Sequence, residues 1–146
     1  MSPRTLFRPG ALAEAATWTL LLAGLLLKYV VQSTDLGVRI GGALHGFVFL
    51  CYVAVTCFTW VNQQWPARAG LSALASAVVP YASIAVERSL DRRGMLGGGQ
   101  EPHGALEKAQ AWALAHPVPP AVILFAAVAA VFGFLLFLGP PGTWFA

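Results

Sequence analysis

"GGALHGFVFLCYV", residues 41–53, is a run of apolar and small residues with a single histidine, His45. The run belongs to a longer apolar stretch from about residue 37 to 61, and three more such stretches cover about residues 11–31, 67–86 and 119–138. Roughly 20 mainly apolar residues in a helix cross a bilayer core about 30 Å thick. The sequence therefore predicts an all-α, polytopic membrane protein with four transmembrane helices.

The composition agrees with a membrane location. Hydrophobic residues make up 58% of the chain and charged residues 10%, whereas charged residues are about a quarter of a soluble domain. The net charge of +3 is spread over the loops, without a basic block of the kind that binds nucleic acid. The first apolar stretch exceeds the core of a secretory signal and lacks a small-x-small cleavage site, so we expect a retained helix. These features predict a multi-pass protein of the bacterial cytoplasmic, or inner, membrane.

The connections between the stretches divide the chain into three parts. The first two connections are short and predict antiparallel neighbouring helices. The third, residues 87–102, is charged and then glycine-rich, and residues 103–116 have the weak amphipathic pattern of a short helix at the membrane surface. We therefore predict a three-helix transmembrane core over residues 1–95, a flexible loop with an interfacial helix over 96–116, and a fourth transmembrane helix with a tail over 117–146.

Polar and small residues form one stripe on each of the first three predicted helices, because residues three and four apart are neighbours on a helix. Lipid offers polar groups no partner, so we expect the three stripes to face one another. The fourth stretch has no polar stripe and should be peripheral, packing through Ala129 and Gly133 or facing a partner subunit. The candidates for a structural role or a ligand cleft are Glu14, Thr17, Lys28, Arg39, His45, Tyr52, Arg68, Ser76, Pro80 and Glu87.

Two interpretations of His45 remain open. Gly42 and Gly46 flank it at a spacing that lets another backbone approach closely, which favours a neutral imidazole hydrogen-bonded to a neighbouring helix. The alternative is a polar group presented to a quinone or lipid headgroup in a cleft. Because the other histidines lie outside the predicted spans, we expect no metal site. We also expect no catalytic residue and no cofactor beyond contact with lipid or quinone, since no catalytic motif is present.

Charged residues of opposite sign recur at matching depths of the predicted helices. Lys28 with Glu87, and Glu14 with Arg68 or Arg8, are the predicted ion pairs, and the alternative is that these side chains extend to the headgroups. Six lysines and arginines fall on the side of the first and third predicted loops, against three on the other side. The positive-inside rule then places both termini outside the cytoplasm.

Three segments resemble a known family: "EAATWTLLLAGLLLKY" (14–29), "GGALHGFVFLCY" (41–52) and "PYASIAVER" (80–88). They are similar to a family of small bacterial integral membrane proteins of unknown function that is common in actinobacteria. The resemblance covers roughly residues 7–95 and implies a three-helix core without an established activity. This chain departs from the family in Tyr81-Ala82, where an aromatic-glycine pair is expected, and in its additional fourth stretch.

Three classes of function fit these features. Small size and little polar mass outside the membrane favour a non-enzymatic accessory, scaffold or assembly subunit of a larger membrane complex, of which a respiratory complex is one example. The alternative is a homo-oligomeric carrier, channel, or lipid- or quinone-binding protein that uses the polar helix interior. A membrane enzyme acting on lipid or quinone is the least favoured class. The expected partners are the lipid bilayer and either another membrane protein or a second copy of the chain.

Overall fold

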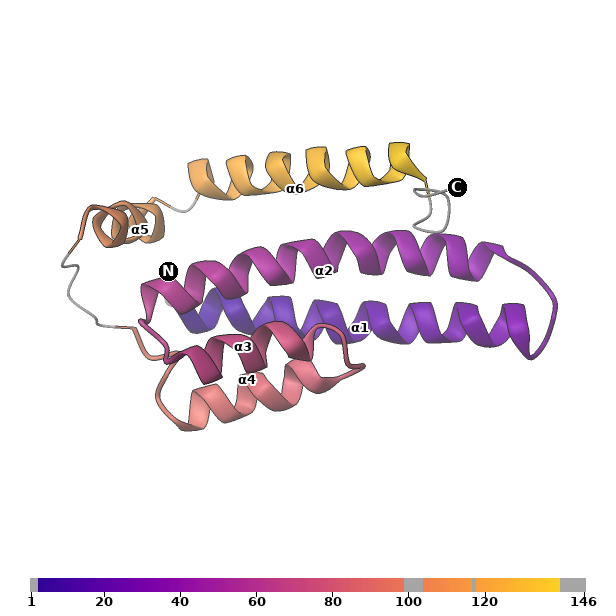
Figure 1. Ribbon diagram of the computed structural model, residues 1–146, viewed down its shortest axis with the longest axis horizontal. Helices are drawn as coiled ribbons and strands as arrows, with labels where there is room; N and C mark the ends of the chain where they lie inside the picture. Colours follow the sequence, from indigo (N-terminus) through magenta and orange to yellow (C-terminus); the bar gives the residue numbers. More distant parts are fainter. Residues whose placement is uncertain (1–2, 99–103, 117, 140–146) are drawn as a thin grey trace.

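The computed structural model describes residues 3–98, 104–116 and 118–139, and every regular element in these ranges is a helix (Figure 1). The helices are α1 (Pro3–Tyr29), α2 (Leu36–Asn62), α3 (Ala67–Ser76), α4 (Ala82–Arg92), α5 (Ala105–Ala115) and α6 (Val118–Leu138). Of these, α1, α2 and α6 are long and apolar enough to cross a membrane. The predicted all-α, multi-pass membrane architecture is therefore confirmed.

Close backbone contact joins α1 and α2, which run antiparallel along most of their length (Figure 1). A Cβ atom on Gly24 would overlap the backbone of Gly37, and a Cβ atom on Gly41 would lie 2.9 Å from the Leu20 carbonyl oxygen. Gly42 is less crowded, because a Cβ atom there would meet only a leucine methyl group at 3.8 Å. The closest approach of the two backbones thus occurs at Gly24, Gly37 and Gly41 rather than at the predicted Gly42.

The predicted third transmembrane helix over residues 67–86 is wrong, because the chain turns back in the middle of this stretch. Helix α3 ends at Ser76, α4 begins at Ala82, and the two pack side by side as a hairpin (Figure 1). Pro80 has no backbone N–H and disfavours helical geometry in the residue before it. Tyr81 follows with a φ of 65°, in the left-handed region. Ten residues of α3 rise about 15 Å, which is half of a bilayer core.

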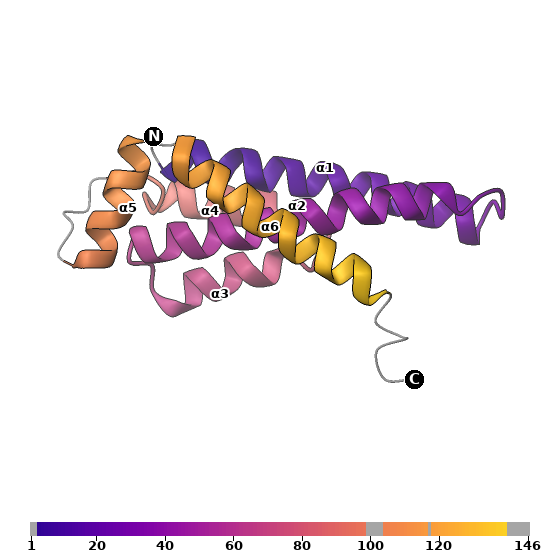
Figure 2. The same cartoon turned by 90° about the horizontal axis from the view of Figure 1, so that it is seen from above.

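The hairpin changes which segments lie at the same end of the molecule. The start of α1, both open ends of the hairpin and α5 lie at one end, which we call the hairpin end (Figure 1). The connection between α1 and α2 lies at the other end, which we call the far end, and α6 runs from the hairpin end toward it without reaching this connection (Figures 1 and 2). Among the described helices, α1, α2 and α6 are therefore the candidate membrane crossings. The two chain termini lie outside the described residues, so their predicted location outside the cytoplasm stays a prediction.

The predicted pair of Lys28 with Glu87 is also wrong. Lys28 lies at the far end, where its Nζ is 3.4 Å from Oδ1 of Asp35. The returning arm α4 carries Glu87 toward the hairpin end instead. At the hairpin end, Arg4 of α1 forms an ion pair with Asp91 of α4.

The last two helices contact the rest of the protein through α2. Helix α5 lies crosswise to the long helices (Figures 1 and 2), and the side-chain amide of Gln110 donates to the Phe58 carbonyl oxygen at 3.4 Å. Helix α6 crosses α2 obliquely (Figure 2), where the rings of Phe125 and Phe132 meet the ring of Phe47 at 5.5 and 5.7 Å between centroids.

The predicted small-residue contacts of α6 are only partly present. Gly46 of α2 lies against α6, since a Cβ atom there would be 3.3 Å from the Phe132 ring. Ala129 and Gly133 are exposed, and a Cβ atom on Gly133 would meet nothing within 4 Å. Packing inside this chain therefore uses the aromatic face of α6, and the face with Ala129 and Gly133 points away from the described helices.

Candidate functional site

Polar side chains gather where the turn of the hairpin meets α1 and α2. We call Glu14, Thr17, His45, Tyr52, Ser76 and Ser83 the hairpin-tip cluster, and all six are buried. They come from four helices, α1 to α4, and lie near the middle of α1 and α2. The helical stripes predicted that Glu14, His45, Tyr52 and Ser76 face the interior, and the burial of all four agrees with this prediction.

Glu14 and Ser83 join α1 to α4. The Ser83 hydroxyl oxygen lies 2.7 Å from Oε2 of Glu14 and 3.1 Å from the Ala11 carbonyl oxygen. Glu14 is 0% exposed, and its Oε1 has no hydrogen-bond partner among the residues that the structure describes. Within the same ranges, the ion pairs involve neither Glu14 nor Arg68 nor Arg8. The predicted pairs of Glu14 with these arginines are therefore wrong.

Tyr52 joins α2 to α3. Its hydroxyl group lies 3.0 Å from the Ser76 hydroxyl oxygen and donates to the Ala73 carbonyl oxygen at 3.3 Å. Thr56, one turn further along α2, donates to the Tyr52 carbonyl oxygen at 2.7 Å. The Tyr52 ring packs against Phe7 of α1 with 5.6 Å between ring centroids. This tyrosine therefore holds α3 against α2 through a buried polar contact within an aromatic core.

His45 joins α2 to α1. Its Nδ1 lies 3.2 Å from the Thr17 hydroxyl oxygen, and its ring centroid is 4.4 Å from that of Trp18. The Thr17 hydroxyl donates to the Glu14 carbonyl oxygen at 3.0 Å. Because a hydroxyl group carries one hydrogen, we assign Nδ1–H of His45 as the donor to Thr17. The geometry agrees with the interpretation of His45 as a contact between helices.

The turn of the hairpin is held by side chains of α1. The Trp18 indole N–H donates to the Ala77 carbonyl oxygen at 3.3 Å, and the Thr19 and Tyr81 hydroxyl oxygens are 3.1 Å apart. Tyr81 is 46% exposed, and Pro80 beside it is half-buried. The turn of the hairpin thus packs against α1, and the hydroxyl pair of Thr19 and Tyr81 is exposed there.

The remaining sequence candidates lie outside the hairpin-tip cluster. Lys28 and Arg39 are at the far end, and Arg68 is exposed at the hairpin end. Glu87 is buried in α4, within electrostatic range of Tyr52. Ser83 was not among the candidates predicted from the sequence. Its helical spacing from Ser76 and Glu87, in the polar stripe of the third apolar stretch, was the signal that could have identified it.

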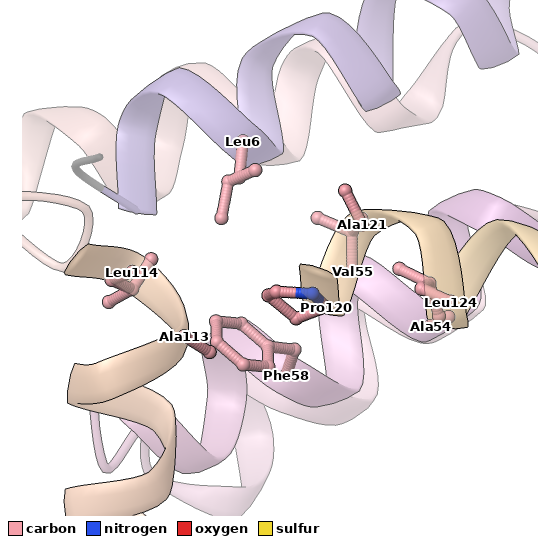
Figure 3. Close-up of a pocket in the computed structure, with 9 residues that line it drawn as sticks. All are labelled: Leu6, Ala54, Val55, Phe58, Ala113, Leu114, Pro120, Ala121 and Leu124. Carbon is pink, nitrogen blue, oxygen red and sulfur yellow. The ribbon is translucent and has the colours of Figure 1, made fainter. Parts of the chain in front are cut away.

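A separate apolar pocket lies between α1, α2, α5 and α6, with a volume of about 280 Å³ (Figure 3). Its walls carry no charged side chain, so a hydrocarbon chain suits it better than a polar ligand. Within the described ranges, no group of three or more His, Cys, Asp or Glu side chains could hold a metal ion. The lining residues of the pocket are Leu6, Ala54, Val55, Phe58, Ala113, Leu114, Pro120, Ala121 and Leu124.

Comparison with known proteins places the first four helices in a family. Residues 4–92, which end with the last residue of α4, match the family described as "Domain of unknown function (DUF3817)". "Putative membrane protein SCO5905" of Streptomyces coelicolor is 45% identical over 87 residues, which are 59% of this chain and 10% of that protein. The chain thus spans about a tenth of the length of this relative. No solved structure matches the chain. The chain belongs to the DUF3817 family, whose function is unknown.

Proposed function

We propose that this protein is a non-enzymatic accessory or scaffold subunit that binds a transmembrane segment of another membrane polypeptide. The observation that carries the proposal is that the α3–α4 hairpin covers only part of one face of the α1–α2 pair (Figure 1). Beyond the turn, the α1 stripe that includes Ala11 and Trp18 continues at helical spacing to Leu22, which is 37% exposed. We call the part of this face beyond the hairpin turn the uncovered face.

Polar groups at the border of the uncovered face support a protein partner over lipid alone. The hydroxyl groups of Thr19 and Tyr81 are exposed, and Thr19 lies about 15 Å along α1 from its last residue, near the middle of the membrane. Lipid tails cannot hydrogen-bond to exposed hydroxyl groups at this depth. The two hydroxyl groups lie 3.1 Å apart and Thr19 donates to the Ala15 carbonyl oxygen at 3.2 Å, so a neighbouring transmembrane helix with a serine or threonine at this depth would add a donor to their remaining acceptor positions.

The relative from Streptomyces coelicolor supports the same proposal. The part of it that matches this chain is about a tenth of its length, so the shared helices are joined covalently to a much larger polypeptide there. In our proposal, the matching helices of this chain likewise pack against further transmembrane polypeptide.

Site-specific photo-crosslinking in membranes of the native host tests the proposal. A photoreactive residue in place of Leu22 would lie on the uncovered face. The control position is Leu20, which is 51% exposed at a similar depth and lies on the opposite side of α1. We expect Leu22 to yield one protein adduct of defined mass and Leu20 to yield lipid adducts. An adduct with the mass of two copies would favour self-association, and lipid adducts alone at Leu22 would contradict the proposal.

The apolar pocket supports a second candidate function, the binding of a lipid or quinone tail. Its volume and wholly apolar walls fit part of a hydrocarbon chain (Figure 3). Val55→Phe should fill the pocket and reduce the lipid or quinone that copurifies with the protein, as measured by mass spectrometry. Ala129→Phe, on an exposed face of α6, is the matched control and should retain it. Equal retention by both variants would rule out the pocket.

The distribution of charge supports one orientation in the bacterial cytoplasmic membrane. Because the hairpin returns to its starting end, seven of the nine lysines and arginines lie at the hairpin end, and only Lys28 and Arg39 lie at the far end. The positive-inside rule therefore favours a cytoplasmic hairpin end. The seven residues are Arg4, Arg8, Arg68, Arg88, Arg92, Arg93 and Lys108.

A further inference from the structure

Ser83 is close to two oxygen atoms, each of which can accept its single hydroxyl hydrogen. Its hydroxyl oxygen lies 2.7 Å from Oε2 of Glu14 and 3.1 Å from the Ala11 carbonyl oxygen. A hydroxyl group has one hydrogen to donate and can accept two more. If Glu14 is a carboxylate, Ala11 and Glu14 must share that single hydrogen. If Glu14 is a carboxylic acid, its own O–H donates to Ser83, and Ser83 donates to Ala11.

The surroundings of Glu14 favour the neutral acid. The side chain is fully buried near the middle of a membrane-spanning helix, and its Oε1 has no hydrogen-bond partner within the described part of the chain. The ion pairs of the described residues are those of Arg4 with Asp91 and Lys28 with Asp35, so no lysine or arginine compensates Glu14. An uncompensated carboxylate at this depth costs far more than a neutral carboxyl group with one unused acceptor.

We propose that Glu14 is a proton-binding site, held as a carboxylic acid whose Oε2–H donates to Ser83, so that the bound proton fastens α4 to α1. Loss of the proton would leave an unpaired anion and a divided Ser83 hydrogen bond. The α4 arm of the hairpin would then lose the hydrogen bond that Glu14 donates to Ser83. The site goes beyond the proposed binding of a membrane partner and does not depend on it.

The other titratable groups around this site do not supply a compensating cation. On α2, Tyr52 is within electrostatic range of both Glu14 and Glu87, and a tyrosine is neutral until strongly alkaline pH. On α4, Glu87 is the other buried acidic side chain, and it cannot supply a positive charge. His45 of α2 directs its Nδ1 to Thr17 rather than to the carboxyl group.

A hydrophobic carbodiimide tests for the bound proton in the full chain reconstituted in lipid vesicles. The carboxylic acid adds across one C=N bond, so that its oxygen bonds to the central carbon and its proton moves to nitrogen. Migration of the acyl group to the other nitrogen then gives a stable N-acylurea that contains the whole reagent. At about pH 8, where an ordinary glutamate with a pKa of about 4.3 is ionised, we expect this adduct on Glu14 of the parent protein and no adduct at this position in Glu14→Gln. A folded protein without an adduct on Glu14 would contradict the proposal.

Infrared spectroscopy supplies an independent measurement on the unmodified protein. We expect the carbonyl band of a protonated carboxylic acid at about pH 8, with a shift in heavy water, and its loss in Glu14→Gln but not in Glu87→Gln. Ser83→Ala should retain the band but move it to higher frequency, because the acid loses its hydrogen-bond acceptor. This variant keeps the test valid if Glu14→Gln fails to fold. Absence of the band from the parent protein would overturn the proposal.

Discussion

At the scale of single residues, buried polar side chains in this protein connect helices in pairs. His45 connects α2 to α1, Tyr52 connects α2 to α3, and Ser83 connects α4 to α1. In lipid, these contacts are available only when the side chains face other helices. Helical periodicity could therefore predict which of these side chains are interior, because a stripe of polar residues is stable only when it faces other helices rather than lipid.

Periodicity could not predict which polar residues would pair. The predicted pairs of Glu14 with an arginine and of Lys28 with Glu87 assumed that the third stretch crosses the membrane in one direction. Once the chain turns back at Pro80, Glu87 returns to the hairpin end, and Glu14 meets Ser83. The sequence could predict how far along its own helix a residue lies. It could not predict the partner of that residue, because the partner depends on the direction in which α4 runs.

The contact of His45 with Thr17 gives a prediction that distinguishes between replacements. The amide nitrogen of asparagine occupies a position close to that of Nδ1, so His45→Asn should preserve the hydrogen bond and nearly parental stability. His45→Gln should be intermediate, because its amide lies one carbon further out. His45→Leu should lower the free energy of unfolding by about 0.6–2 kcal/mol, the range for hydrogen bonds between membrane helices.

Unfolding of the purified variants in mixed micelles measures these differences. Thr17→Val removes the partner hydroxyl group and should cost a similar amount, with little additional loss in the double variant. A leucine variant as stable as the parent would contradict the structural role of His45. It would instead favour a role in ligand binding.

At the scale of helices, the deciding feature is the hairpin of α3 and α4. Its sequence is long and apolar enough to predict a crossing, and Pro80 was a candidate for a structural role or a ligand cleft rather than for a turn. The proline and the positive φ of Tyr81 instead mark a reversal. Length and hydropathy cannot separate a kinked crossing from two half-length helices, because either one places apolar residues in the membrane and polar residues at its surface.

Contact between α1 and α2 depends on glycine at the crossing point. Gly24→Ala would place a methyl group on the backbone of Gly37, which cannot move as a flexible side chain could. We expect a loss of about 1–3 kcal/mol in unfolding free energy, the usual range for overpacking. Gly133→Ala is the matched control, because a Cβ atom there meets nothing within 4 Å, and its stability should equal or exceed that of the parent. Equal stability of both variants would argue against the close packing of α1 and α2.

At the scale of the whole molecule, the family match and the fold divide the chain at the same place. The match ends with α4, and the main contacts of α5 and α6 with the preceding helices are with α2. The glycine-rich composition after α4 led to the same expectation from the sequence, and the independence of the two parts stays a prediction. The number of crossings could not be predicted in the same way, since it required the direction of α4.

This division predicts that a shortened chain folds. A fragment ending at Gly98 retains the buried Leu96 and the hydrogen bond from the Trp65 indole to the Met95 carbonyl oxygen. We expect it to be monodisperse in detergent, with the helix content of α1 to α4 and a cooperative thermal transition. A fragment ending at Asp91 is the control and should be less stable, because it loses these contacts. Aggregation of the Gly98 fragment would contradict the division.

The central claim is that the chain turns back at Pro80, so that residues before α3 and after α4 lie on the same side of the membrane. Labelling of single cysteines with a membrane-impermeant maleimide tests it most directly. The variants Arg68→Cys, Arg93→Cys and Ser33→Cys are made in a background in which Cys51 and Cys57 are replaced by alanine. In vesicles of one orientation, we predict that positions 68 and 93 react from the same side and position 33 from the opposite side. Reaction of position 93 from the side of position 33 would contradict the hairpin and restore a continuous third crossing.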